Sequence, residues 1–247
     1  MSRFREKFTN GFIIGSNQAP NNVIYLQIFT KELGVITAKA KVSPKLTGKF
    51  QGKLEPLTKA MFVLYKGQTT WSIKEITNVQ NTHLDLVTHP IQELIHFICK
   101  IYRQLLPEDE PLASLFVMLE QVHQNIANHI YSTSSIIYFL AQTLDKIGIL
   151  PNLKTCPGCK SEITGNATYD PAQQEIFCTN CIPNHSEQLV QINLNQRKTI
   201  YYATKTNLID FNKIQIDPNI QAKSIRLLQV ITANYLGKSP SLVSLPI

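Results

Sequence analysis

The sequence predicts an α+β protein of more than one domain, in which a small five-stranded β-barrel precedes a helical region that carries an inserted four-cysteine module. Three observations support this prediction: apolar and polar residues alternate over the first eighty positions, apolar residues then recur every three to four positions, and two Cys-x-x-Cys pairs follow. With 43% hydrophobic and 17% charged residues, the 247-residue chain has the composition of a folded protein. We expect a basic domain over residues 1–80 and a helical domain over residues 81–247, with the cysteine module at about residues 155–182.

The amino-terminal strands are predicted from alternation and from turn residues. In "VITAKAKV", Ile36 and Ala38 fall on one face of a strand, while Lys39 and Lys41 fall on the other. The preceding "NVIYLQIFT" is rich in β-branched and aromatic residues, and Gly34 closes the turn between the two segments. "AMFVLY" and "TTWSIKEI" flank a second turn, and "FIIG" adds a further strand. Five short strands of this length fit a small closed barrel.

The positive charge of the chain is concentrated in this barrel. Residues 1–80 hold twelve Lys and Arg against four Asp and Glu, whereas residues 81–247 hold twelve against thirteen. Such a field favours nucleic acid or an anionic membrane surface, although a merely soluble basic domain is the alternative. In the loop "KVSPKLTGKFQGKLEP", lysines recur every four residues around one aromatic residue, which indicates a nucleic-acid-binding loop. The alternative is a connector whose lysines only face solvent. We predict nucleic-acid contacts from Lys39, Lys41, Lys45, Lys49, Phe50 and Lys53, with Trp71 as a weaker stacking candidate.

Four helices are predicted after the barrel, over residues 90–105, 112–130, 134–147 and 220–236, from apolar spacing and from the glycines Gly148 and Gly237. Short links between them predict that they pack together. On the first helix, Lys100 and Arg103 are expected to edge a groove for an acidic, apolar-tipped peptide of a partner protein. The apolar surface of that groove would come from Ile95, Ile98, Leu115 and Leu119, unless these residues belong to the core.

The strongest chemical pattern is the set of four cysteines at Cys156, Cys159, Cys178 and Cys181. Two Cys-x-x-Cys pairs separated by eighteen residues fit a tetrahedral zinc site. Two disulfides are the main alternative, but a chain without a recognisable secretion signal is expected in the reducing cytoplasm. His185 could compete as a ligand. Because four thiolates leave no position for water or substrate, we expect one structural zinc ion per chain.

The cysteine module is not suited to binding phosphate, and no catalytic motif is found elsewhere. From Thr155 to Cys181 there is one Lys against three Asp and Glu, and zinc with four thiolates adds two more negative charges. The sequence contains no Walker loop, GxGxxG or His-Glu-x-x-His motif. We therefore expect the module to staple the fold or dock a protein, Cys99 to be a core thiol, and the protein to have no enzymatic activity.

The order of these features resembles the RecO family of bacterial recombination mediators. "YLQIFTKELGVITAKAK" is similar to the family's second and third strands, and "IQELIHFICKIYRQLLPEDEP" to its first long helix and loop. "FLAQTLDKIGILPNLKTCPGC" is similar to the helix that leads into the first cysteine pair, and "RLLQVITANYLGKSPSL" to the carboxy-terminal helix. The resemblance covers nearly the whole chain. Two departures are Ala40, where the family usually has glycine, and "APNN", where it usually has charged residues.

This resemblance implies an oligonucleotide-binding (OB) fold, no catalysis and a role in DNA repair. It implies binding of single-stranded and double-stranded DNA, annealing of complementary strands and, with RecR, loading of RecA onto strands coated by single-strand binding protein. The expected location is the cytoplasm, at the nucleoid, with no membrane partner. Two alternatives are a zinc-containing RNA-binding or ribosome-associated protein, and a zinc hydrolase or deaminase, which would need an open metal position and a general base.

Overall fold

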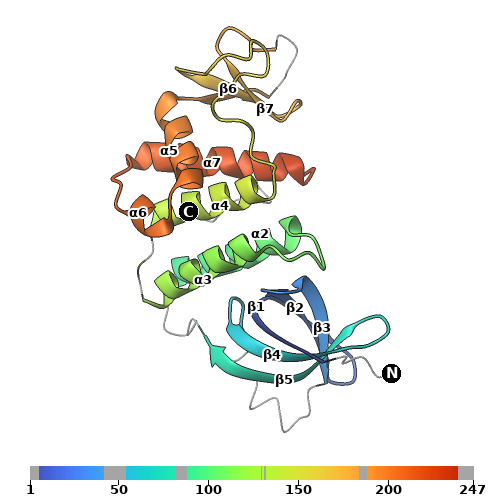
Figure 1. The fold of residues 1–247 in the computed structure, drawn as a ribbon. Helices are drawn as coiled ribbons and strands as arrows, with labels where there is room; N and C mark the ends of the chain where they lie inside the picture. The colour runs from blue at the N-terminus through green and yellow to red at the C-terminus, as the bar shows by residue number, and fades with distance from the viewer. Residues whose placement is uncertain are drawn as a thin grey trace. The chain divides into compact units, whose positions relative to one another are not determined.

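The computed structural model describes residues 6–41, 54–81, 88–128, 130, 132–183 and 188–238 (Figure 1). Its contacts divide the chain into two compact units, one built from the residues up to 129 and the other beginning at Ile130. The first unit contains a barrel and the two helices that follow it. The second contains the later helices and the cysteine module. The last barrel strand ends at Gln80, where the sequence predicts the division between domains. That this position is a domain boundary stays a prediction.

Five strands close into the predicted barrel. They are β1 (Glu6–Ala19), β2 (Val23–Thr30), β3 (Gly34–Lys41), β4 (Lys59–Lys66) and β5 (Trp71–Gln80). Their order is β1-β2-β3-β5-β4, and β1 pairs with β4 to complete the ring. Only the short β3–β5 contact is parallel among these pairs. Residues 6–12 of β1 pair with β4 and residues 11–19 pair with β2, and a bulge between Ile13 and Gly15 shifts the register with β2. This closed five-stranded sheet is OB-like, as predicted.

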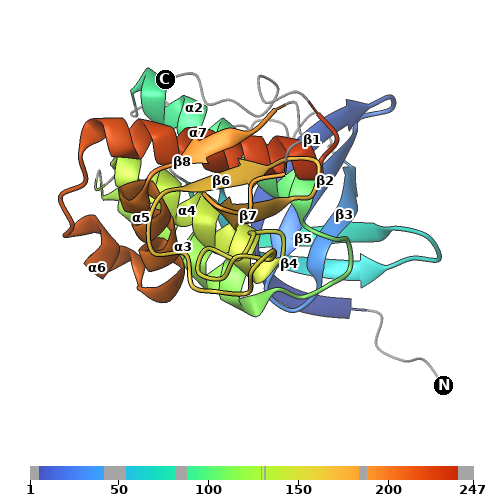
Figure 2. The ribbon, with the colours of Figure 1, turned by 90° about the horizontal axis from the view of Figure 1, so that it is seen from above.

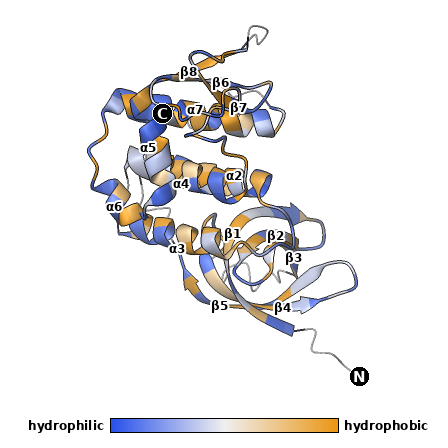
Figure 3. Ribbon diagram, turned by 45° about the horizontal axis from the view of Figure 1, so that its top comes forward, coloured by the Kyte–Doolittle hydropathy of each residue, from blue (hydrophilic) through white to orange (hydrophobic). Residues whose placement is uncertain are grey.

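Alternating residues of the five strands fill the barrel. Figure 3 shows hydrophobic and hydrophilic residues along the same strands. The inward-facing cluster consists of Ile13, Leu26, Ile28, Ile36, Ala38, Ala60, Phe62, Leu64 and Trp71. Trp71 is only 8% exposed and lies within this core. The expectation that Trp71 stacks on a base is therefore wrong, because its ring is committed to the interior of the barrel.

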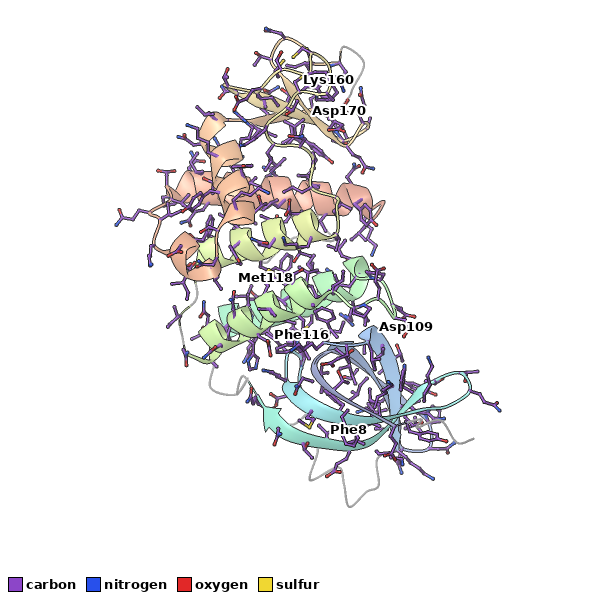
Figure 4. All side chains as sticks on the ribbon, viewed as in Figure 1. Phe8, Asp109, Phe116, Met118, Lys160 and Asp170 are labelled. Carbon is purple, nitrogen blue, oxygen red and sulfur yellow. The ribbon has the colours of Figure 1, made fainter. Side chains whose placement is uncertain are left out.

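Helices α2 (His89–Leu105) and α3 (Ala113–Ala127) pack on the barrel through aromatic side chains. The ring of Phe29 meets Tyr102 of α2 edge-on at 5.3 Å, and it lies 5.6 Å from the ring of Phe116. Phe116 of α3 also lies 5.3 Å from Phe12, so its side chain points toward the barrel (Figure 4). These contacts join both helices to the outside of β1 and β2.

The loop between α2 and α3 is tied to the start of β3. The backbone N–H of Asp109 donates to the carbonyl oxygen of Val35 at 2.9 Å, and Asp109 itself has a left-handed φ of 57° (Figure 4). Gly34, with φ at 71°, packs so closely on the backbone of Glu110 that no side chain could be accommodated there. The sequence "PEDEP" thus forms a fixed connection rather than a free linker.

The second unit combines four helices with a three-stranded sheet. Its elements are α4 (Thr133–Lys146), β6 (Ala167–Asp170), β7 (Glu175–Cys178), β8 (Val190–Ile192), α5 (Leu194–Lys205), α6 (Leu208–Asn212) and α7 (Pro218–Tyr235). Helix α4 packs against α5, α6 and α7, and β6 lies between β7 and β8 (Figure 2). Gly148 and Gly237 adopt left-handed φ values of 76° and 61° where α4 and α7 end, as expected for helix-terminating glycines.

All four predicted helices are present, to within a few residues at each end. The described residues also contain α5, α6 and β8, which the sequence analysis did not predict. None of the helices in these ranges has both the length and the apolar character needed to cross a bilayer.

Candidate metal centre and nucleic-acid interface

The four predicted metal ligands come together in the second unit. Cys156 and Cys159 lie in the segment that follows α4, Cys178 ends β7, and Cys181 lies in the next turn. Their four sulfur atoms all lie within 4.8 Å of one another, and Cys159 Sγ is 3.9 Å from Cys178 Sγ. A tetrahedron with sulfurs about 2.3 Å from a central ion has edges of about 3.8 Å. All four thiols are free, so the geometry is that of a metal site rather than of two disulfides.

Tight local turns hold the sulfurs in place. The N–H of Lys160 donates to the carbonyl oxygen of Cys156 at 2.9 Å, and Lys160 has a left-handed φ of 60°. The N–H of Cys178 donates to Cys156 Sγ at 3.5 Å. At Gly158, any β-carbon would come within 3.0 Å of Cys181 Cβ and 3.2 Å of its sulfur. The glycine of "CPGC" therefore lets the second cysteine pair approach the first.

The environment of the cluster shifts the pKa values of Cys156 and Cys181 in opposite directions. Burial alone would raise the pKa of Cys156, but the N–H groups of Cys178, Cys159 and Gly158 outweigh it and lower the pKa to about 6. Interaction with the thiol of Cys178, desolvation and the remaining sulfurs raise the pKa of Cys181 to about 12. Four thiolates so close together would repel one another, and a bound divalent cation would offset this repulsion. His185, the competing ligand in the sequence analysis, lies outside the described residues.

Two side chains that the sequence analysis missed anchor the cysteine module to helices. Arg197 of α5 is only 6% exposed, and its Nη1 and Nη2 donate to the carbonyl oxygens of Leu153 at 2.7 Å and Gly165 at 3.2 Å. Asn234 of α7 donates through Nδ2 to the carbonyl oxygen of Pro171 at 2.7 Å. These contacts fix the segments on both sides of the first cysteine pair and the turn between β6 and β7. They are consistent with a module that staples the fold.

Of the residues predicted to contact nucleic acid, the structure describes Lys39 and Lys41. Both are exposed, and both project from the outer face of β3 because Ala38, which precedes Lys39, points into the core and side chains alternate along a strand. Lys45, Lys49, Phe50 and Lys53 lie outside the described residues. An aromatic residue that was not predicted, Tyr25, lies directly opposite Lys39 on β2. The one signal for it in the sequence is its place between the inward-facing positions Ile24 and Leu26.

The groove expected beside Lys100 and Arg103 is not present as an exposed surface. All four apolar residues proposed to form it are completely buried: Ile95, Ile98, Leu115 and Leu119. Arg103 instead lies against the barrel, where a methyl group at Gly15 would come within 2.8 Å of Arg103 Cδ. The expectation of an apolar groove here is therefore wrong, because these side chains complete the core. A role for the two cations themselves in partner binding stays a prediction.

Comparison with known proteins identifies the family. A family model described as "Recombination protein O C terminal" matches residues 94–243. The chain is 22% identical to "DNA repair protein RecO" of Dehalococcoides mccartyi over 216 residues, which cover 87% of this chain and 85% of that protein. It is 20% identical to "DNA repair protein RecO" of Alkaliphilus metalliredigens over 233 residues, which cover 93% of this chain and 94% of that protein. The chain therefore belongs to the RecO family of DNA repair proteins, which are non-enzymatic recombination mediators.

Proposed function

We propose that this protein binds single-stranded and double-stranded DNA through its basic barrel, anneals complementary strands and, with RecR, helps to load RecA onto strands coated by single-strand binding protein. The observation that carries the proposal is the exposed pair Lys39 and Lys41 on the outside of a closed OB-like barrel. This barrel belongs to the most basic third of the chain. Exposed cations on such a barrel neutralise phosphates without any requirement for a particular base sequence.

The distribution of charge along β3 supports this assignment. At the Gly34 end, the loop after α2 presents three exposed acids, Glu108, Asp109 and Glu110, and Glu32 is exposed in the turn before β3. At the other end, the exposed charges on the strand are those of Lys39 and Lys41. Phosphates are therefore repelled from one end of the strand and attracted to the other. The basic end is also the one that leads into the lysine-rich segment after residue 41.

We further propose that the four cysteines hold one zinc ion per chain in a structural role. Zinc prefers thiolate ligands in tetrahedral geometry, and the sulfur separations suit that geometry. A site closed by four thiolates cannot bind a substrate. The role of the ion would be to hold the segment between α4 and α5 in its folded form. The free energy of ion binding then also stabilises the fold of this segment.

The test is strand annealing and RecA loading on DNA coated by the cognate single-strand binding protein, with and without RecR. The double variant Lys39→Glu/Lys41→Glu should lose both activities. Lys146→Glu/Lys238→Glu makes the same change of net charge at exposed positions of the second unit and should retain them. Equal activity of the two double variants would place the DNA-binding surface elsewhere. Preference of the wild-type protein for structured RNA over single-stranded DNA would contradict the proposal in favour of the RNA-binding alternative.

A further inference from the structure

Tyr25 occupies the middle of a row of outward-facing residues on three neighbouring strands. It pairs in register with Asn17 of β1 on one side and with Lys39 of β3 on the other. Residues that pair in this way project from the same face, with Cβ atoms roughly 5 Å apart. Leu26 and Ala38, which follow Tyr25 and precede Lys39, both point into the core. The side chains of Tyr25 and Lys39 therefore start from neighbouring positions on the outer face.

The ring of Tyr25 has no partner in the part of the chain that the structure describes. Several other aromatic residues of the barrel are already engaged: Phe12 and Phe29 contact the helices, and Lys74 lies 5.3 Å from the ring of Tyr65. Tyr25 is 37% exposed, and no ring or cation contact to it is found among the described residues. Part of a large planar side chain is thus presented to solvent, where it could lie against another ring.

The surroundings of this ring suit a polyanion. The row with Tyr25 and the rows on either side of it contain no acidic residue: they are Gly15–Gln27–Thr37, Asn17–Tyr25–Lys39 and Ala19–Val23–Lys41. Lys39 and Lys41 flank the ring on the β3 side, roughly 7 Å apart along the strand. On the β1 side, the side chain of Arg103 lies over Gly15 and next to Gln27. A strand of nucleic acid could place phosphates near these cations while one base lies on the phenol.

We infer that Tyr25 is a base-stacking residue, and that this face of the barrel selects unpaired over paired nucleic acid. In a duplex both faces of each base are covered by its neighbours, so only an unpaired base can lie against the tyrosine ring. The lysines attract any phosphate backbone, whereas the ring distinguishes single strands. The inference rests on the proposed function, since it specifies how the barrel would hold DNA.

The test compares the affinity of the full-length protein for a single-stranded oligonucleotide, the same oligonucleotide without bases, and a duplex, by fluorescence anisotropy at fixed salt. Tyr25→Ala should weaken single-strand binding about ten-fold, in line with the loss of one stacked base. It should leave abasic and duplex binding unchanged. Tyr25→Phe keeps the aromatic face and should restore the affinity. Phe8→Ala is the matched control, because Phe8 (Figure 4) is an exposed aromatic of β1 that pairs with Val63 of β4 and not with β2 or β3.

The outcomes separate this inference from the function on which it rests. If Tyr25→Ala weakened single-strand, abasic and duplex binding equally, or if Tyr25→Phe failed to restore affinity, Tyr25 would act through the fold and not by stacking. If Tyr25→Ala had no effect while Lys39→Glu/Lys41→Glu abolished binding, the stacking role would be overturned and the DNA-binding barrel retained. A wild-type protein that bound none of the three probes would contradict both.

Discussion

Asn234 in the last helix donates its side-chain N–H to the carbonyl oxygen of Pro171, 63 residues earlier in the turn of the cysteine module, at 2.7 Å. The same amide group lies 3.3 Å from the hydroxyl of Tyr169. A single side chain of α7 therefore holds two residues of the β6–β7 hairpin. The module is consequently part of the packed second unit and not an appendage on flexible stems.

Asn234→Ala should reduce the free energy of unfolding of the second unit by about 1–2 kcal/mol, because the partly buried carbonyl group of Pro171 and the hydroxyl of the buried Tyr169 each lose a hydrogen-bond partner. Metal content should stay the same, since the four sulfurs are untouched. Urea unfolding followed by circular dichroism measures the change. Lys223→Ala, at an exposed position of the same helix, is the control. Equal midpoints for the two variants would show that the contact contributes nothing.

Removal of the metal should unfold the cysteine module. Structural zinc in small modules contributes on the order of 10 kcal/mol, so chelation or Cys178→Ser should abolish the local fold. We expect one zinc per chain in the wild-type protein by elemental analysis and none in Cys178→Ser, while the barrel keeps most of its affinity for single strands. Ser161→Ala preserves all four sulfurs and should retain the ion. Metal-free protein purified without chelator, with four freely titrating thiols, would refute the assignment.

The salt dependence of DNA binding should report the contribution of the β3 lysines. Each phosphate neutralised on a single strand contributes roughly −0.7 to the slope of log affinity against log salt concentration. Replacing both Lys39 and Lys41 with Gln should therefore make the slope shallower by about 1.4. Titrations at four salt concentrations measure this slope. An unchanged slope would mean that neither lysine contacts phosphate, even if the affinity itself fell.

The buried His123 should make the first unit less stable in mild acid. Burial lowers the pKa of His123, as does the nearby Lys59; the carbonyl of Gln80 and the carboxylate of Glu120 oppose this without reversing it. The folded state therefore keeps this imidazole neutral at pH values where the unfolded chain, with the ordinary pKa of 6.5, is already protonated. The stabilisation is complete above about pH 6.5 and is lost as the pH falls toward the folded pKa.

Urea midpoints at pH 7.5, 6.5 and 5.5 test this dependence. The free energy of unfolding of the wild-type protein should fall with decreasing pH, by at most about 1.4 kcal/mol per pH unit from this residue. His123→Gln should show a flatter profile, because the other histidines titrate in both proteins. Parallel profiles would show that His123 does not carry the dependence.

Cys99 should be inert to alkylation in the native protein. Burial in α2 raises the pKa of its thiol from 9.0 to about 12, against smaller opposing effects of the Leu57 backbone and Arg103. The thiolate fraction near pH 8 is then about a thousand-fold smaller than for an ordinary cysteine. With the metal bound, iodoacetamide and mass spectrometry should find Cys99 unmodified until urea unfolds the first unit. Rapid labelling of Cys99 in the native protein would contradict this burial.

Local patterns account for the parts of the fold that the sequence predicted. The strands have one apolar face each, so their alternation is visible without knowledge of their partners. Both cysteine pairs are likewise local, and only their separation had to be interpreted. Helix α5 was missed because "LNQRKTIYYATK" is polar over most of its length. Its start was nevertheless encoded by a capping box, in which Asn193 and Gln196 bond each other's backbone N–H groups.

The remaining features depend on contacts between distant segments. The buried guanidinium of Arg197 reaches the carbonyl of Leu153, 44 residues earlier, and nothing in the local sequence marks it as a core residue. Arg103 was predicted to edge a groove for an acidic peptide, and its packing against Gly15 of β1 is a long-range contact that the local sequence does not reveal. Tyr25 became a candidate only when the register placed it opposite Lys39. Register and long-range packing, rather than residue type, decide these assignments.

The separation of acids and lysines at opposite ends of β3 also has a consequence for how the protein meets its ligand. Glu108, Asp109 and Glu110 lie at one end of a short strand, and Lys39 and Lys41 lie at the other. The negative field of a nucleic acid would attract the lysines and repel the acids. The protein would therefore turn its lysines toward the nucleic acid before the two surfaces touch. The effect extends over about one Debye length, roughly 8 Å at physiological ionic strength. If nucleic acid is the ligand, as proposed, collisions would be productive more often, and this gain in association rate would disappear in concentrated salt.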